Sequence, residues 1–144
     1  MAWVVYDAFL TRSYGTGTKV DFTADTINLL LCTSAYTPDQ TNHNFRDDLG
    51  STEVAGTNYS AGGVSPGTIT AAVAAHVLTI DCPDVVFAQS ASGFTNARYA
   101  VLAKILGGAA SADPLIAYYD LGSDRGNVAG ALTLATTSGL FVTP

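Results

Sequence analysis

The sequence predicts a mainly β fold, a single-domain antiparallel β-sandwich or small barrel with a short N-terminal arm or helix. Three observations predict it. A chain of 144 residues suits one domain. Short apolar or alternating runs recur along it, and clusters of Gly, Pro, Asn and Asp separate them as turns do. We expect residues 1–20 to form the arm or helix and residues 21–144 to form the β-sandwich domain.

The first half of the chain contains one clear strand signal and one long polar stretch. The N-terminal segment "VVYDAFLTRSYG" has helical spacing, although its β-branched start is equally typical of a strand. The apolar run "TINLLLCTS" predicts a buried strand that ends at the turn-forming "YTPDQTN". In the polar stretch 37–67, "NHNFRDDLGS" predicts a helical turn and "EVAGTNYSAGG" a short strand or ordered loop. A loop of this length is usually functional or carries minor structure of its own.

The second half predicts further strands. "GTITAAVAAHVLTIDCPD" has strand signals, with Leu78, Ile80 and Cys82 on one face. Alternation in "ARYAVLAKIL" turns Arg98 and Lys104 outward, as a half-buried antiparallel strand requires. "LIAYYDLG", "NVAGALTLATT" and "GLFVTP" complete the set of expected strands. The expected core positions are Tyr99, Val101, Ala103, Ile105, Leu115, Ala117, Tyr119, Leu121, Leu132 and Leu134.

Composition limits the classes of partner. Hydrophobic residues make up 48% of the chain and charged residues only 12%, about half the usual quarter. Such a surface suits packing against copies of the chain or against a scaffold, although a small β-domain with a neutral surface has the same composition. The net charge of −6 and the scattered basic residues argue against nucleic acid as a partner.

The start of the chain, the length of its apolar runs and its two cysteines indicate where the protein is made and whether its thiols are oxidised. No basic region precedes an apolar core at the start, and no apolar run reaches the length of a membrane span, so we expect no signal segment, no membrane partner and synthesis in a cytoplasm. Cys32 and Cys82 each end an apolar run. Two buried thiols are the favoured interpretation, and a disulfide is the alternative.

No constellation of residues predicts catalysis. His43 lies near Asp47 and Asp48, as a base with its orienting acid would, but no Ser or Cys stands in a recognisable nucleophile motif, and we expect a solvated histidine. His76 falls between two expected strands, where a turn explains it. The turn around Asp120, Asp124 and Asn127 resembles the start of a calcium loop but lacks the ligand spacing and the terminal Glu. We expect no enzyme activity, no metal and no cofactor.

Five stretches together resemble a family of small structural proteins of tailed-bacteriophage virions. In order they are "DFTADTINLLLCTSAYTPDQ", "GSTEVAGTNYSAGG", "ARYAVLAKIL", "PLIAYYDLGS" and "LTLATTSGLFVTP". The resemblance covers roughly residues 21–144, while "MAWVVYDAFLTRSYG" departs from the more helical, charged start of the family. The positions matched are structural rather than catalytic.

The resemblance implies a non-enzymatic virion protein. The first expectation is a capsid decoration (cement) protein on the capsid exterior, which binds the junctions between capsomers in many copies. Its partners would be the major capsid protein and copies of itself, with a homotrimer at local threefold positions as one arrangement. A tail, neck or head-tail connector component is the alternative in the same class. An adhesion module that binds carbohydrate through Trp3 and exposed tyrosines is the alternative from another class.

The apolar N-terminus supplies the candidate binding residues. Trp3, Val4, Tyr6 and Phe9 form a dense apolar cluster at a chain end, where disorder is the usual state. Such a cluster must either fold back on its own domain or pack on a neighbour. In the second case it would bind the partner, with Trp3 as the buried anchor.

Overall fold

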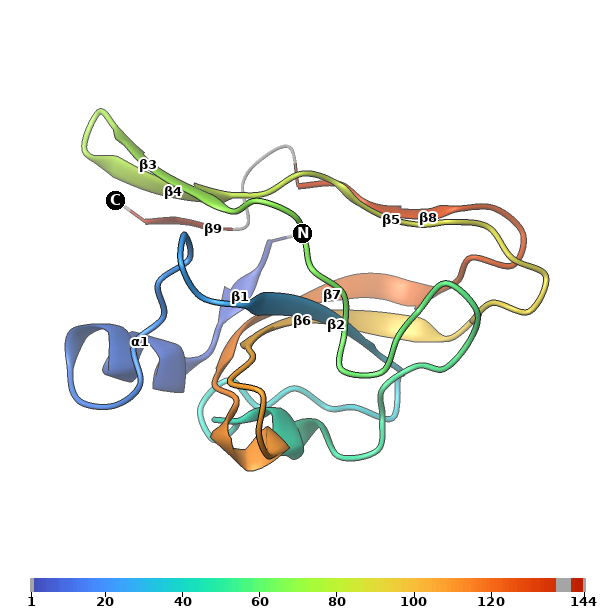
Figure 1. Ribbon diagram of the computed structural model, residues 1–144, viewed down its shortest axis with the longest axis horizontal. Helices are drawn as coiled ribbons and strands as arrows, with labels where there is room; N and C mark the ends of the chain where they lie inside the picture. The colour runs from blue at the N-terminus through green and yellow to red at the C-terminus, as the bar shows by residue number, and fades with distance from the viewer. Residues whose placement is uncertain (1, 137–140, 144) are drawn as a thin grey trace.

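The computed structural model describes residues 2–136 and the backbone of residues 141–143 (Figure 1). It confirms the predicted fold class, since the described residues form antiparallel sheets with a short α-helix near the N-terminus. The sheets lie in two layers, as in a small β-sandwich (Figure 1).

A four-stranded sheet forms the central layer. It is built from β1 (Val4–Val5), β2 (Ile27–Cys32), β6 (Ala97–Lys104) and β7 (Leu115–Arg125), in the order β1-β7-β6-β2. Every neighbouring pair is antiparallel. The helix α1 (Asp7–Tyr14) follows β1 directly and lies at one end of this sheet (Figure 1).

The second layer lies on one face of that sheet and has two parts. One is a three-stranded sheet with the order β3 (Thr70–Ala74), β4 (Val77–Asp81) and β9 (Phe141–Thr143). The other pairs β5 (Val85–Phe87) with β8 (Leu132–Leu134). The chain runs from β4 into β5, so the two parts follow one another along the layer (Figure 1). Of the predicted closing strand, residues 139, 140 and 144 lie outside the described residues.

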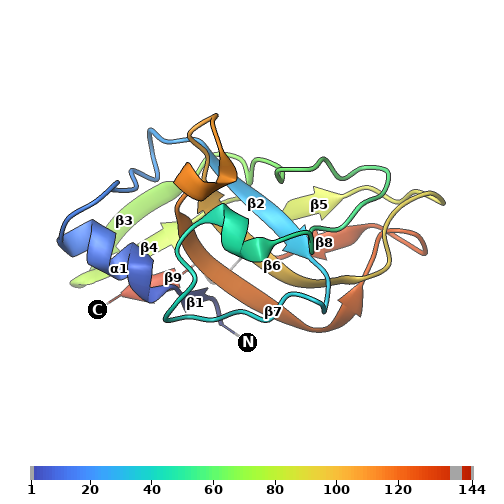
Figure 2. The ribbon, with the colours of Figure 1, turned by 90° about the horizontal axis from the view of Figure 1, so that it is seen from below.

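Loops and two 3₁₀ turns, η1 (Arg46–Leu49) and η2 (Ala110–Ala112), cover the opposite face of the four-stranded sheet (Figure 2). The turn η1 falls where the sequence predicted a helical turn. The predicted strand or loop "EVAGTNYSAGG" is an ordered loop along the edge of β2, because Glu53 bridges to Cys32 and Val64 bridges to Leu29. The central sheet is therefore covered on both faces.

The covered sheet corrects the predicted alternation in β6. Ala100 and Leu102 belong to the cluster between the two layers, whereas Val101 and Ala103 belong to the cluster on the loop side. Both faces are apolar, so a period of two does not separate inside from outside. Lys104, expected to be exposed, is 9% exposed. Its ammonium lies 2.7 Å from the Asp25 carboxylate, which explains how the charge is tolerated there.

The predicted core is correct in part. The buried members of that set are Val101, Ala103, Leu115, Ala117, Leu121 and Leu134. The half-buried members are Tyr99, Ile105, Tyr119 and Leu132. Both cysteines are buried free thiols, as predicted. The N-terminal segment is joined to the sandwich rather than separate, because β1 pairs with β7 and Phe9 packs in the core between the layers.

Candidate functional site

The candidate binding residues at the N-terminus differ in exposure. Tyr6 is 0% exposed and Phe9 is 8% exposed, so both side chains pack within the chain's own core. Trp3 and Val4 are half-buried. Trp3 packs on Tyr119, with ring centroids 5.6 Å apart. The structure therefore corrects the expectation for Tyr6 and Phe9. For Trp3 and Val4, binding to a partner stays a prediction.

Tyr6 begins a hydrogen-bonded chain that corrects the interpretation of His43 as a solvated residue. The Tyr6 and Tyr36 hydroxyl oxygens are 2.6 Å apart, and the Tyr36 hydroxyl lies 2.9 Å from His43 Nδ1. The backbone N–H of Asp39 also donates to Nδ1, so this nitrogen is an acceptor and Tyr36 donates to it. Burial, and then the hydrogen bond to Tyr36, raise the pKa of Tyr6 far above its usual value. These contacts fix the 36–43 loop on the sheet, and we assign them a structural role.

The expected acidic turn is not a turn around Asp120 and Asp124, because both residues lie within β7. Arg98 donates two hydrogen bonds to Asp120, at 2.7 and 3.1 Å. Asn127 is fully buried and satisfied by backbone groups: its Oδ1 accepts from Phe94 N, and its amide donates to the carbonyls of Thr57 and Ala88. Within residues 2–136, no three His, Cys, Asp or Glu side chains gather as a metal site requires.

Half of the chain's basic residues are held in internal ion pairs. Besides Lys104 with Asp25 and Arg98 with Asp120, Arg46 contacts the fully buried carboxylate of Asp113 at 2.8 Å. The Lys104 pair joins a loop to the end of β6, the Arg98 pair joins β6 to β7, and the Arg46 pair joins η1 to the segment before β7. They do not form a continuous basic surface.

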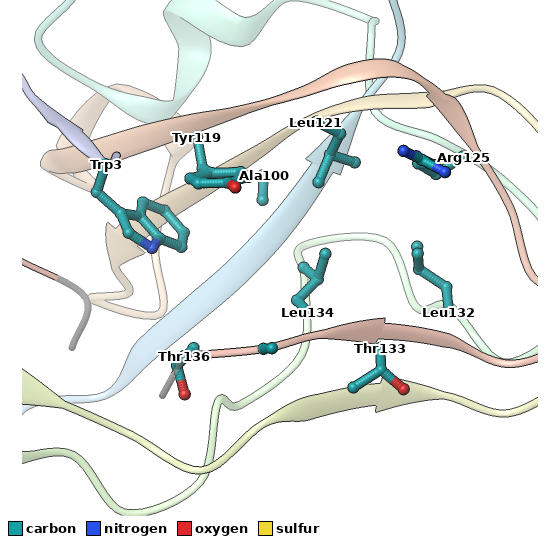
Figure 3. Close-up of a pocket in the computed structure, with 10 residues that line it drawn as sticks. Trp3, Ala100, Tyr119, Leu121, Arg125, Leu132, Thr133, Leu134 and Thr136 are labelled. Carbon is teal, nitrogen blue, oxygen red and sulfur yellow. The ribbon is translucent and has the colours of Figure 1, made fainter. Parts of the chain in front are cut away.

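A pocket of about 390 Å³ lies between the two layers, beside the N-terminus. Figure 3 shows Trp3 and Tyr119 at one end of it and Arg125 with Leu132 at the other, with Leu121 and Leu134 between them. The walls carry one cation and threonine hydroxyls but no carboxylate, histidine or thiol among the described lining residues. The pocket can therefore bind an apolar or aromatic-stacking group.

β3, the first strand of the β3–β4 hairpin, is the most exposed apolar strand among the described residues, whereas β4 is half-buried against the core. All five residues of β3 are exposed to solvent, and Val73 is 70% exposed. The turn at the tip of the hairpin holds Ala75 at φ 49° and His76 at φ 67°, two left-handed residues as a type I′ turn requires. This placement agrees with the turn position predicted for His76. The tip reaches past the end of the four-stranded sheet (Figure 1).

Sequence reasoning predicted the hairpin strands but did not recognise their exposure. The signal was available, because no charged residue occurs between Glu53 and Asp81. An exposed segment of that length normally carries Lys, Glu, Asp or Arg. Apolar strands that avoid charge while lying on the surface indicate contact with another surface.

Comparison with known proteins identified no relative of the chain. Neither a scan of protein-family models nor searches of curated proteins and of solved structures found a significant match to the chain. None of the helices in the described part is long and apolar enough to cross a membrane. We therefore infer function from the geometry of the chain itself.

Proposed function

We propose that this chain is a non-enzymatic structural protein of a tailed-bacteriophage virion, and that it decorates the capsid exterior in many copies. The observation that carries the proposal is β3, an apolar strand of the β3–β4 hairpin whose five residues are all exposed to solvent, on a chain with few charged residues. An element of this kind suits contact with a neighbouring protein surface rather than with solvent. The resemblance of residues 21–144 to virion structural proteins supports the same class.

The physical basis of such a role is repetition. A protein bound in many copies to one lattice gains avidity, so each contact can be small and neutral. Binding to the assembled shell but not to free subunits stabilises the shell by mass action. The compact two-layer fold suits this task, since internal ion pairs and buried polar groups hold its loops in place.

The test is the copy number of this chain in purified virions, measured by quantitative mass spectrometry against the major capsid protein. Hundreds of copies are the expected result and indicate a decoration of the shell. A few dozen copies would instead support the tail, neck or connector role. Absence of the chain from virions would overturn the proposal.

The carbohydrate-binding alternative has one observation in its favour, the pocket lined by Trp3 and Tyr119 (Figure 3). Against it, among the tyrosines only Tyr14 is fully on the surface, at 82% exposure, whereas the rest are buried or half-buried. Calorimetric titration with host-surface glycans would separate the two. Saturable binding that Trp3→Ala abolishes would favour the adhesion role, and absence of heat would favour decoration.

A further inference from the structure

The outer edge of β3 differs from the outer edge of β2. The outer edge of β2 is covered, because Val64 and Glu53 of the following loop bridge to Leu29 and Cys32. The order β3-β4-β9 leaves β3 at the end of its sheet, and the described residues place no segment against its outer side. An uncovered edge presents unpaired backbone N–H and C=O groups to any strand that can reach them.

Proteins that work as monomers protect such edges, and β3 carries none of the usual protections. These are a charged side chain, a proline, a bulge or a very short strand. Thr70–Ala74 is five residues long, contains only Thr, Ala and Val, and pairs with β4 in unbroken register from Thr70–Asp81 to Ala74–Val77. The edge is therefore regular and open to pairing.

The hairpin geometry determines which backbone groups face outward. In a hairpin with a two-residue loop, the pair that flanks the loop, here Ala74 and Val77, exchanges hydrogen bonds. Hydrogen-bonded pairs then alternate along the strands, so Thr70, Ala72 and Ala74 direct their backbone groups toward β4. It follows that the N–H and C=O groups of Ala71 and Val73 point to the open edge.

This pattern is complementary to itself. An antiparallel strand related by a twofold axis at Ala72 places Ala71 opposite Val73 of the second copy, and Val73 opposite Ala71. These are the residues whose backbone groups face outward on both strands, so each pair can exchange both of its hydrogen bonds. Ala72 faces its own equivalent at the centre, as a non-hydrogen-bonded pair.

The side chains also fit a second copy. No charged residue lies on the pairing strands, so no like charges meet across the axis. Ala71 lies on the same side as Leu78 and Ile80, in the wall of a groove of about 730 Å³. The groove extends to Phe9, Phe22 and α1, and it also contains the Lys104–Asp25 pair. Val73 lies on that same side, 70% exposed, where the second copy would cover it.

We propose that two copies of this chain pair through their β3 edges about a twofold axis at Ala72, forming one continuous sheet across the dimer. The proposal does not depend on the virion role, but it assigns twofold symmetry to self-association where the sequence suggested a homotrimer. A single short strand buries little area, so we expect a dissociation constant on the order of tens of micromolar in solution.

Position 72 offers a charge-reversal test, because a twofold axis places that residue opposite itself. We would measure the mass of the full-length protein by sedimentation at concentrations from roughly 1 µM to 1 mM. Wild type should form a dimer within that range. Ala72→Lys alone and Ala72→Asp alone should each weaken dimerisation at least tenfold, whereas an equal mixture of the two should restore it as a heterodimer.

Val86→Lys is the matched control, because Val86 is also an exposed apolar residue, 59% exposed, but lies on β5. It should dimerise as wild type does. A wild type that stays monomeric throughout, or a dimer that both Ala72 variants leave intact, would overturn the proposal. A monomeric wild type whose virion binding is lost in Ala72→Lys would assign the edge to a different protein. Dimerisation without any presence in virions would leave this proposal standing and refute the virion role.

Discussion

The ammonium of Lys104, at the end of β6, lies 2.7 Å from the carboxylate of Asp25 and donates a hydrogen bond to the Lys19 carbonyl at 2.8 Å. The contact ties the segment before β2 to the end of the central strand. Lys104 and Asp25 side chains are 11% and 23% exposed, so this pair is much less hydrated than a surface pair. The alternation in the sequence instead predicts that Lys104 points to solvent, where its replacement would have little effect on stability.

Replacement of Lys104 by Ala should lower the free energy of unfolding by about 2 kcal/mol, since it leaves a partly buried carboxylate without its partner. Arg98→Ala is the control, because the pair of Arg98 with Asp120 is more exposed to solvent, and its loss should lower the stability less than the loss of Lys104 does. Urea unfolding at pH 7 measures both. Equal losses for the two variants would contradict the ranking.

The effect of Lys104→Ala should also depend on pH. Burial raises the pKa of Asp25, but the hydrogen bonds from Lys104 and from the Asp21 backbone outweigh it and hold the pKa below its ordinary value. The carboxylate therefore contributes stability above about pH 4, and this contribution is lost as the pH falls through the folded-state pKa. We expect the difference between wild type and variant to be constant from pH 5 to 8 and to shrink at lower pH. A difference unchanged at pH 3 would show that the charge pair is not its cause.

Both thiols should be inert in the folded protein. Burial raises the pKa of Cys32 to about 12 and also raises the pKa of Cys82, so both thiols are mainly protonated at pH 8 and lie away from solvent. Iodoacetamide should leave native protein unmodified over an hour and label both cysteines after denaturation in guanidinium, as read by intact mass. Rapid labelling of native protein would contradict the burial of the thiols, and a mass lower by that of two hydrogens would reveal a disulfide.

The sequence predicted which segments form strands better than it predicted what surrounds them. The run "INLLLC" becomes β2 and the turn at His76 falls where expected, since apolar runs and strand junctions are local signals. The two faces of β6 were assigned wrongly because loops distant in sequence, with η1 and η2, cover the sheet face that the pattern left open. Coverage of that kind depends on tertiary packing and leaves no period in the strand itself.

The contacts of single polar residues were also not predictable from the sequence. His43 and Asn127 each lie in a polar stretch of sequence, where solvation is the usual outcome. In the structure, His43 accepts from Tyr36, and Asn127 holds the backbone of residues that lie 33 to 70 positions away. Such contacts cannot be read from neighbours in sequence. For the proposed dimer edge, by contrast, the missing charges between Glu53 and Asp81 were a readable signal.

Asn127→Ala should destabilise the fold by about 2–3 kcal/mol, because it leaves the buried Phe94 N–H and the Thr57 carbonyl without this partner, although the Ala88 carbonyl keeps its hydrogen bond from Asn58. Asn42→Ala is the control, because Asn42 is exposed and its loss should change stability by no more than about 0.5 kcal/mol. Thermal and urea unfolding measure both. A mild effect at Asn127 would mean that water replaces the amide.

Tyr6→Phe should test the hydrogen-bonded chain separately from packing. It removes the hydroxyl that contacts Tyr36 but keeps the ring, so we expect a loss of about 1 kcal/mol. Tyr6→Ala should cost about 3–5 kcal/mol, because a fully buried ring is lost as well. If both variants instead melt like wild type, the N-terminal segment is not part of the core and the binding role predicted for it regains support.

Substitutions in the turn of the β3–β4 hairpin should raise the stability of the protein without any change in the two strands. Ala75 and His76 hold left-handed backbone angles, which cost an ordinary residue about 1–2 kcal/mol and cost Gly almost nothing. Asn-Gly is the preferred sequence for such a turn. The double variant Ala75→Asn, His76→Gly should therefore raise the free energy of unfolding by on the order of 1 kcal/mol. Ala74→Gly, one residue earlier in the strand, should lower it by about 0.5–1 kcal/mol. A double variant less stable than wild type in urea unfolding would show that the tip does not hold this turn.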